Sequence, residues 1–199
     1  MNKMKNTFFI VIVVTIYFSC EEPLEYKFQN REQLIDCHGV DNKLVHEALY
    51  SFEDDIASYY NNSLEPGFLN YDYGYARYIY KGALGEADYK NIVSNYSIKV
   101  LRRLLREKEL WNKTTGESKL NYNSEFVNCL INNINNKDIK KTLLSNREVN
   151  SLNPKILADV YRINIRDAHS DKYFAMFLAL DTYYQYIIDI DFTEINTNE

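Results

Sequence analysis

The chain has 199 residues, of which 46% are hydrophobic and 26% are charged, proportions that are typical of a soluble globular protein. Glycine and proline are scarce, at 6 and 3 residues, which argues against β-sandwiches, β-barrels and glycine-rich phosphate loops. The net charge is −5, and phosphate contacts need an excess of lysine and arginine, so we expect no nucleic acid partner.

Residues 1–19 have the features of a cleaved export signal. Lys3 and Lys5 make the start positive, and the apolar run TFFIVIVVTIYF follows. As a helix this run would be about 18 Å long, which is too short for a bilayer core of about 30 Å. A positive start, a short apolar stretch and the small residue Ser19 just before Cys20 are the parts of a signal peptide.

The step from Ser19 to Cys20 and then to a polar chain resembles bacterial lipoprotein precursors. In that family the peptide is cut before a cysteine whose sulfur is acylated. The resemblance implies that Cys20 is the lipid attachment site and that the membrane is a partner through this anchor. Tyr17 and Phe18 are bulkier than the residues usual in the family. An uncleaved anchor, or ordinary secretion with Cys20 as a plain thiol, are the alternatives.

Glu21 and Glu22 resemble the acidic tract that routes some Bacteroidota lipoproteins to the outer face of the outer membrane. This implies an outer-membrane location, with the periplasmic face as the alternative to the cell surface. The stretches ALYSFEDDIASYY and LALDTYYQYIIDIDF are similar to parts of uncharacterised Bacteroidota lipoproteins. That resemblance implies no particular activity.

Cys37 and Cys129 remain as an even pair in an oxidising compartment, which makes a disulfide between them possible. The alternative is that Cys129 packs as a buried thiol among its apolar neighbours. The three histidines lie outside any CxxCH or HExxH motif. The cluster Asp167-x-His169-x-Asp171 has ligand types but also suits a helix start. We therefore expect no metal and no cofactor.

The 180 residues from Cys20 on carry 21 basic and 28 acidic side chains, a net charge of −7, and are enough for one domain. We expect a polar tether over 20–40, a helical domain over 41–191 and a tail over 192–199. Apolar periodicity and caps predict an all-α bundle of six or seven helices. The expected segments are 41–60, 70–84, 97–111, two helices that start near Ser124 and Asp138, one opened by Asn153-Pro154, and one from Ser170 to Asp191.

The last helix is predicted to be central, because its apolar residues point in nearly every direction. Asp181 lies in the middle of it, and an ionised carboxylate there needs a cation or several donors. The candidate cations are Arg77, Arg162 and Arg166. We expect a structural pair at this place rather than a catalytic one.

His46 and Glu53 are seven residues apart on the first expected helix and therefore share one side of it. A carboxylate that orients a histidine is half of a general-base device. The other half, a nucleophile or a metal, is indicated by no motif. A small hydrolase that uses this pair is the second hypothesis.

Two surfaces are candidates for binding. In NYDYGYARYIYKG, one set of tyrosines points to one side of the expected helix and a second set points nearly opposite, so one set needs a surface outside the core. The third expected helix carries a basic stripe opposite its leucines, which suits lipid phosphates, acidic glycans or an acidic partner, or is only a solvated face. The first set of tyrosines is Tyr71, Tyr75 and Tyr78, and the second set is Tyr73 and Tyr80. The basic stripe consists of Lys99, Arg102, Arg103 and Arg106.

These patterns together favour a lipid-anchored envelope protein that is not an enzyme and that binds an envelope protein or a glycan. A structural or immunity-type protein, which blocks a partner by its shape, is the third hypothesis.

Overall fold

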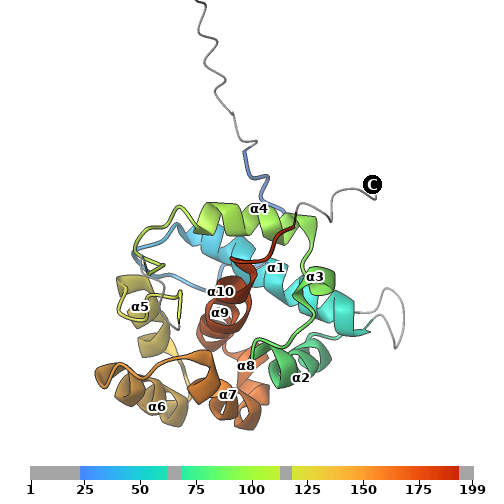
Figure 1. Ribbon diagram of the computed structural model, residues 1–199. Coiled ribbons are helices and arrows are strands. Elements are labelled where there is room, and N and C mark those ends of the chain that lie inside the picture. Colours follow the sequence, from blue (N-terminus) through green and yellow to red (C-terminus); the bar gives the residue numbers. More distant parts are fainter. Residues whose placement is uncertain (1–22, 62–68, 113–117, 193–199) are drawn as a thin grey trace, which may run out of the picture.

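A computed structural model describes residues 23–61, 69–112 and 118–192 of the chain (Figure 1). The expected signal at 1–19, the lipid attachment site Cys20, and the pair Glu21-Glu22 lie outside these residues. The all-α class is confirmed: within the described ranges the structure contains no sheet, and the one isolated β-bridge joins Trp111 to Leu120.

Each of the seven expected segments contains a helix, and α3 and α8 are short additions. The helices are α1 (Asn42–Asn61), α2 (Tyr71–Gly82), α3 (Tyr89–Ile92), α4 (Asn95–Leu104), α5 (Glu125–Asn133), α6 (Lys137–Glu148), α7 (Pro154–Ile163), α8 (Ile165–Ser170), α9 (Lys172–Ala179), the π-helix η1 (Leu180–Tyr184) and α10 (Gln185–Ile187).

Side-chain caps start several helices where the sequence predicts them. Ser94 accepts a hydrogen bond from the Ser97 amide at α4, and Ser124 accepts one from the Val127 amide at α5. These bonds satisfy amide groups that have no partner within the helix. Asn153 caps α7 in the same way, with a proline at the first helical position.

Two expected helix ends are wrong. Asp171, not Ser170, caps α9, because its carboxylate accepts hydrogen bonds from the amides of Tyr173 and Phe174. Ser170 is the last residue of α8. The helix expected to reach Trp111 stops at Leu104. The chain then tightens into turns, and the Trp111 indole Nε1 folds back to donate to the Leu104 carbonyl at 2.7 Å.

The continuous helix of α9, η1 and α10 forms the centre of the core, as predicted. Every residue from Phe174 to Tyr184 is buried, and α1, α5 and α8 pack around α9 (Figure 1). A helix that is apolar on all sides is stable only when it is enclosed in this way.

The close contact of α1 with α2 depends on Gly74. A Cβ atom at this position would lie 2.9 Å from the Ala57 Cα atom. Only glycine lets the two backbones approach so closely, which explains why a helix tolerates glycine here despite its cost in a helix interior.

The expected tether over 20–40 is not free of the domain. Residues 23–40, here called the stem, contain no helix, but Phe28, Ile35 and Cys37 in it are buried. These apolar side chains lack helical periodicity, and for that reason the sequence pattern does not reveal their burial. At the other end Phe192, expected in the tail, is also buried; residues 193–199 lie outside the described part.

Candidate functional site

The outer side of α2 presents two of the expected tyrosines. Tyr80 is 58% exposed and Tyr73 is half-buried. Arg77, which is exposed, lies between them along the helix, and its guanidinium carbon is 6.0 Å from the centre of the Tyr73 ring. Positions 73, 77 and 80 follow the spacing of one helix face. We call Tyr73, Arg77 and Tyr80 the α2 outer face.

The first set of tyrosines points into the protein. Tyr75 and Tyr78 are fully buried, and their rings pack edge-on against Phe52. Tyr71 is half-buried and donates its hydroxyl hydrogen to Asp54 at 2.8 Å. The two sets of tyrosines therefore lie on opposite sides of α2, in the arrangement that the helical angles indicate.

His46 and Glu53 are hydrogen-bonded to different groups in this structure. His46 Nε2 lies 2.7 Å from the Phe28 carbonyl oxygen of the stem. Glu53, which is buried, accepts hydrogen bonds from the Tyr75 hydroxyl at 3.0 Å and from Lys172 Nζ at 2.6 Å. Both side chains thus bond to other groups of the protein. A cavity of about 150 Å³ beside His46 is lined by Tyr26, Gln29, Arg31, Gln33, Lys43 and Glu47.

The basic stripe lies on α4 and just beyond its end. Lys99, Arg102 and Arg106 are exposed, and Arg103 is half-buried. Figure 1 shows α4 at one end of the domain, the same end at which the described chain begins. The sequence predicts the stripe itself but not this position beside the stem.

The stem is fixed to α1 and α4 by Glu47, a residue that the sequence analysis does not single out. Its buried carboxylate accepts hydrogen bonds from the backbone amides of Lys27 and Phe28 at 2.9 to 3.1 Å. It also accepts one from the Tyr96 hydroxyl on the first turn of α4. The Tyr96 hydroxyl in turn lies 3.0 Å from the Glu25 carbonyl oxygen. An acid in an amphipathic helix gives no sequence signal that distinguishes this role from a solvated one.

A cavity of about 570 Å³ opens where the stem meets α4. It is lined by Pro23, Glu25, Tyr26, Lys27, Tyr96 and Lys99. The cavity is thus lined by acidic and basic groups next to two aromatic rings.

Asp181 is fully buried, and its partners are neutral. The Tyr161 hydroxyl donates to it at 2.5 Å, the Tyr122 hydroxyl also donates to it, and Gln185 Nε2 lies 3.3 Å away. Burial raises the pKa of Asp181 to about 6, although these hydrogen bonds act in the opposite direction. The arginines expected as partners, Arg77, Arg162 and Arg166, are not among these groups.

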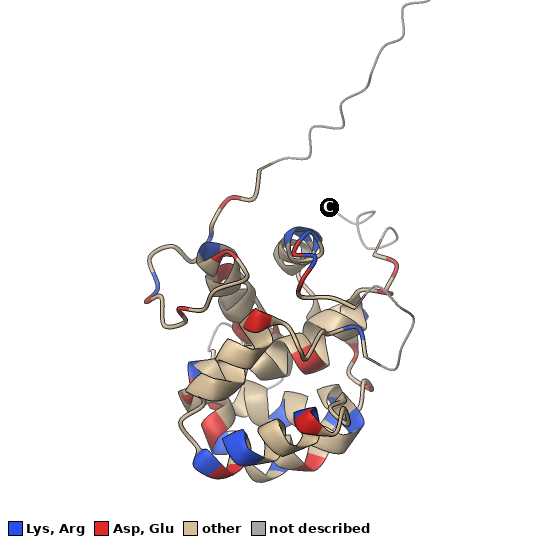
Figure 2. Ribbon diagram, turned by 90° about the vertical axis from the view of Figure 1, so that its left-hand side faces the viewer, with Lys and Arg blue, Asp and Glu red and all other residues tan. Residues whose placement is uncertain are grey.

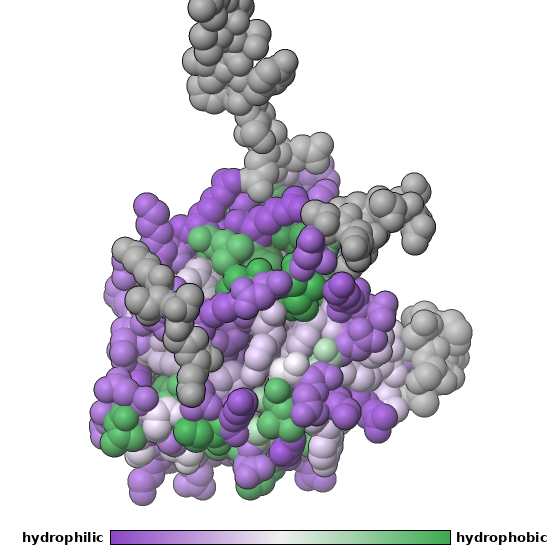
Figure 3. Space-filling model, viewed as in Figure 1, coloured by the Kyte–Doolittle hydropathy of each residue, from purple (hydrophilic) through white to green (hydrophobic). Residues whose placement is uncertain are grey.

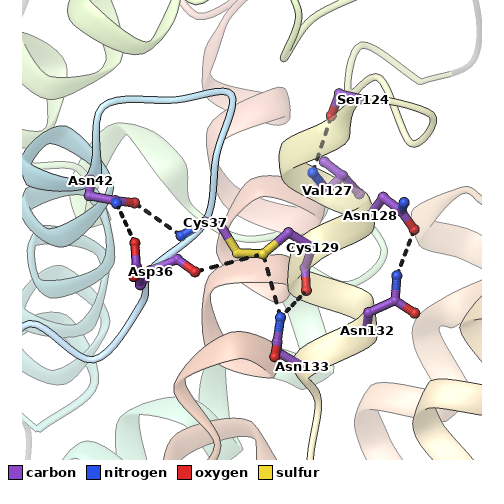
Figure 4. Close-up of a disulfide and its surroundings, with 9 residues drawn as sticks. All are labelled: Asp36, Cys37, Asn42, Ser124, Val127, Asn128, Cys129, Asn132 and Asn133. Carbon is purple, nitrogen blue, oxygen red and sulfur yellow. Dashed lines mark hydrogen bonds between the residues drawn. A yellow bond between two sulfur atoms is a disulfide. The ribbon is translucent and has the colours of Figure 1, made fainter.

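Cys37 and Cys129 form a disulfide with a Cα–Cα distance of 5.9 Å (Figure 4). The bond joins the stem to α5. The Asn42 side chain, at the start of α1, accepts a hydrogen bond from the Cys37 amide at 3.2 Å and donates one to Asp36 at 2.9 Å. The stem is therefore held at several points before the helical domain begins.

The members of the Asp167, His169 and Asp171 cluster each have other partners. His169 Nδ1 lies 2.8 Å from Asp72 on α2, and Asp171 caps α9. Within the described residues no group of three or more histidine, cysteine, aspartate and glutamate side chains is placed to hold a metal ion.

Across the described ranges, none of the helices combines the length and the apolar character needed to cross a bilayer. No protein-family model, curated protein or solved structure matches this chain.

Proposed function

We propose that this chain is an exported lipoprotein of the outer membrane, acylated at Cys20, whose helical domain binds another envelope protein without catalysing a reaction. The signal-like residues 1–19 and Cys20 support the anchor. The Cys37–Cys129 disulfide supports export, because such bonds persist mainly in oxidising compartments.

The observation that carries the binding role is the α2 outer face. Tyrosine and arginine are enriched at the energetic centres of protein interfaces, since they combine large contact area with polar tips. Tyr73, Arg77 and Tyr80 offer this combination on one exposed helix side. The cavities described above lie elsewhere, at the stem and around α4, so this face favours a protein partner over a glycan that would need a pocket.

The hydrolase hypothesis has less support, because His46 and Glu53 are bonded to different groups. A general base must reach the proton that it removes. The Glu53 carboxylate accepts hydrogen bonds from Tyr75 and Lys172, so these contacts do not support its role as the group that orients His46.

The anchor is tested by the substitution Cys20→Ser in the full chain. We expect the wild type in the membrane fraction after carbonate washing and labelled by a fatty acid analogue. The variant is expected unlabelled and in the soluble fraction, since two or three acyl chains hold a protein on a bilayer and none remains without the sulfur. A variant that stays in the membrane fraction would refute acylation as the means of attachment.

The binding role is tested by cross-linking in intact cells, followed by purification of the tagged protein. The variant Tyr73→Ala/Tyr80→Ala is compared with Val149→Ala/Ile163→Ala, which removes two exposed apolar side chains elsewhere. We expect a cross-linked partner with the wild type and the control, and at least tenfold less with the tyrosine variant, because two central aromatic residues contribute about 1–2 kcal/mol each. Equal recovery with both variants would exclude the α2 outer face as the contact.

A further inference from the structure

We infer that the exposed side of α4 docks on anionic phosphate headgroups of the bilayer to which the Cys20 anchor attaches, so that the domain lies with α4 against the membrane. This inference rests on the proposed acylation of Cys20. It adds two points to the binding role of α2: the orientation of the domain on the membrane, and a contact of α4 with lipid.

The charge of this segment is opposite to that of the whole chain. Residues 89–106 contain five basic residues and no acidic one, although the chain has a net charge of −5. Lys99, Arg102 and Arg106 in this segment are exposed. Leu105, next to Arg106, is also exposed, at 43%. A helix side that combines basic groups with an exposed apolar residue is typical of contacts with the interface of an anionic membrane.

The stem brings this side of α4 to the membrane. Pro23 is three positions after Cys20, and three residue steps span at most about 11 Å. From Pro23 on, the chain lies beside α4: the Tyr96 hydroxyl oxygen lies 3.0 Å from the Glu25 carbonyl oxygen and accepts a hydrogen bond from the Lys27 amide at 3.1 Å. Figures 1 and 2 show the beginning of the described chain and α4 at the same end of the domain. An acylated Cys20 would therefore keep α4 within reach of the headgroups.

The stem holds this orientation because it is bonded to the domain. Glu47 accepts hydrogen bonds from the amides of Lys27 and Phe28, and the Phe28 ring packs edge-on against Tyr96 at 5.8 Å between centres. A free tether would let the domain rotate over the membrane. A stem that is bonded to the domain keeps the α4 end of the domain toward the membrane.

The cavity of about 570 Å³ gives the surface its chemistry for phosphate. Lys27 and Lys99 line it together with Tyr26 and Tyr96. Ammonium groups attract phosphate, and tyrosine rings are enriched at the headgroup level of membranes. Glu25 also lines the cavity, and Lys27 Nζ lies 3.7 Å from an Asp54 carboxylate oxygen. The attraction for phosphate therefore comes mainly from Lys99 on α4.

The test uses the full chain as it is purified from the cell envelope and mixed with preformed vesicles, either of phosphatidylcholine alone or with 30% phosphatidylglycerol. A membrane-impermeant amine reagent labels exposed lysines, and mass spectrometry gives the rate at each one. We expect Lys99 to be labelled at least fivefold more slowly on the anionic vesicles, since each basic residue near such a surface contributes about fivefold to the docking equilibrium. Lys141 on α6, which is exposed, serves as the internal reference and should not change.

Two matched variants reverse two charges each. Arg102→Glu/Arg106→Glu should abolish the protection of Lys99, whereas Lys137→Glu/Lys155→Glu on α6 and α7 should leave it intact. Salt at 0.5 M should also remove the protection through screening.

The outcomes separate the two proposals. If the protein floats with neither kind of vesicle, the anchor is refuted and this inference falls with it. If it floats with both kinds but Lys99 is labelled equally, or if the two variants behave alike, the anchor stands and the α4 surface is refuted.

Discussion

Asp181, Asp55 and Glu53 are buried carboxylates, and each accepts a hydrogen bond from a buried tyrosine hydroxyl. Tyr161 donates to Asp181 at 2.5 Å, and Tyr183 donates to Asp55 at 2.5 Å. Burial raises the pKa of both aspartates, because desolvation penalises the charged form. Some of the many tyrosines of the chain thus act as neutral hydrogen-bond donors to carboxylates in the core.

Asp181 makes the free energy of unfolding depend on pH. Its pKa is about 6 in the folded protein and 3.8 is the ordinary value, so the folded state binds the proton more tightly. The stabilisation that results is present below pH 3.8 and is lost as pH rises through 6. Wild type should lose this stabilisation between pH 4.5 and pH 8, whereas Asp181→Asn has no carboxylate there to titrate. We therefore expect the free energy of unfolding of Asp181→Asn, relative to that of the wild type, to be about 2 kcal/mol higher at pH 8 than at pH 4.5.

Urea unfolding at the two pH values measures this change. The control is Asp159→Asn, which alters an exposed carboxylate on α7. If the difference between Asp181→Asn and the wild type is the same at both pH values, the raised pKa is wrong.

Among the elements, the stem departs most from expectation. Residues 23–40 contain no helix, yet the Cys37–Cys129 disulfide and the Glu47 carboxylate attach them to α5 and α1. The disulfide closes a loop of 92 residues. In the chain-entropy account such a loop contributes about 4 kcal/mol by restricting the unfolded chain.

Removing the disulfide should therefore lower stability strongly. We expect Cys37→Ser/Cys129→Ser to lose about 4 kcal/mol in urea unfolding, and reduced wild type to match it. The reductant should not affect the variant, which provides the control. An unchanged midpoint in the double variant would contradict the account.

The sequence predicts the elements better than the contacts between them. Caps such as Ser124 and Asn153 are local, because the side chain and the amide that it bonds are three residues apart. The partners of Asp181 come from distant segments, since Tyr122 is 59 residues away. Glu47 and Phe28 are 19 residues apart, so local patterns also do not reveal the contact of Glu47 with the stem. For that reason they do not reveal the position of the basic stripe beside the stem.

At the scale of the whole molecule, the candidate surfaces lie in different places. α4 and the start of the described chain occupy one end, and α6 and α7 occupy the other (Figure 1). Exposed apolar side chains occur at and between these far helices, namely Val149, Ile156 and Ile163. Figure 3 shows apolar groups over this region, separated by hydrophilic ones. With α4 toward lipid, the far end and α2 would remain open to proteins.

Trp111 is the single tryptophan of the chain, and its buried indole donates to the carbonyl of Leu104, the last residue of α4. An intrinsic fluorophore therefore contacts the end of α4, the helix that we propose docks on the membrane. Its emission wavelength reports whether that helix end is intact, and the same signal follows denaturation and vesicle titrations without any added dye.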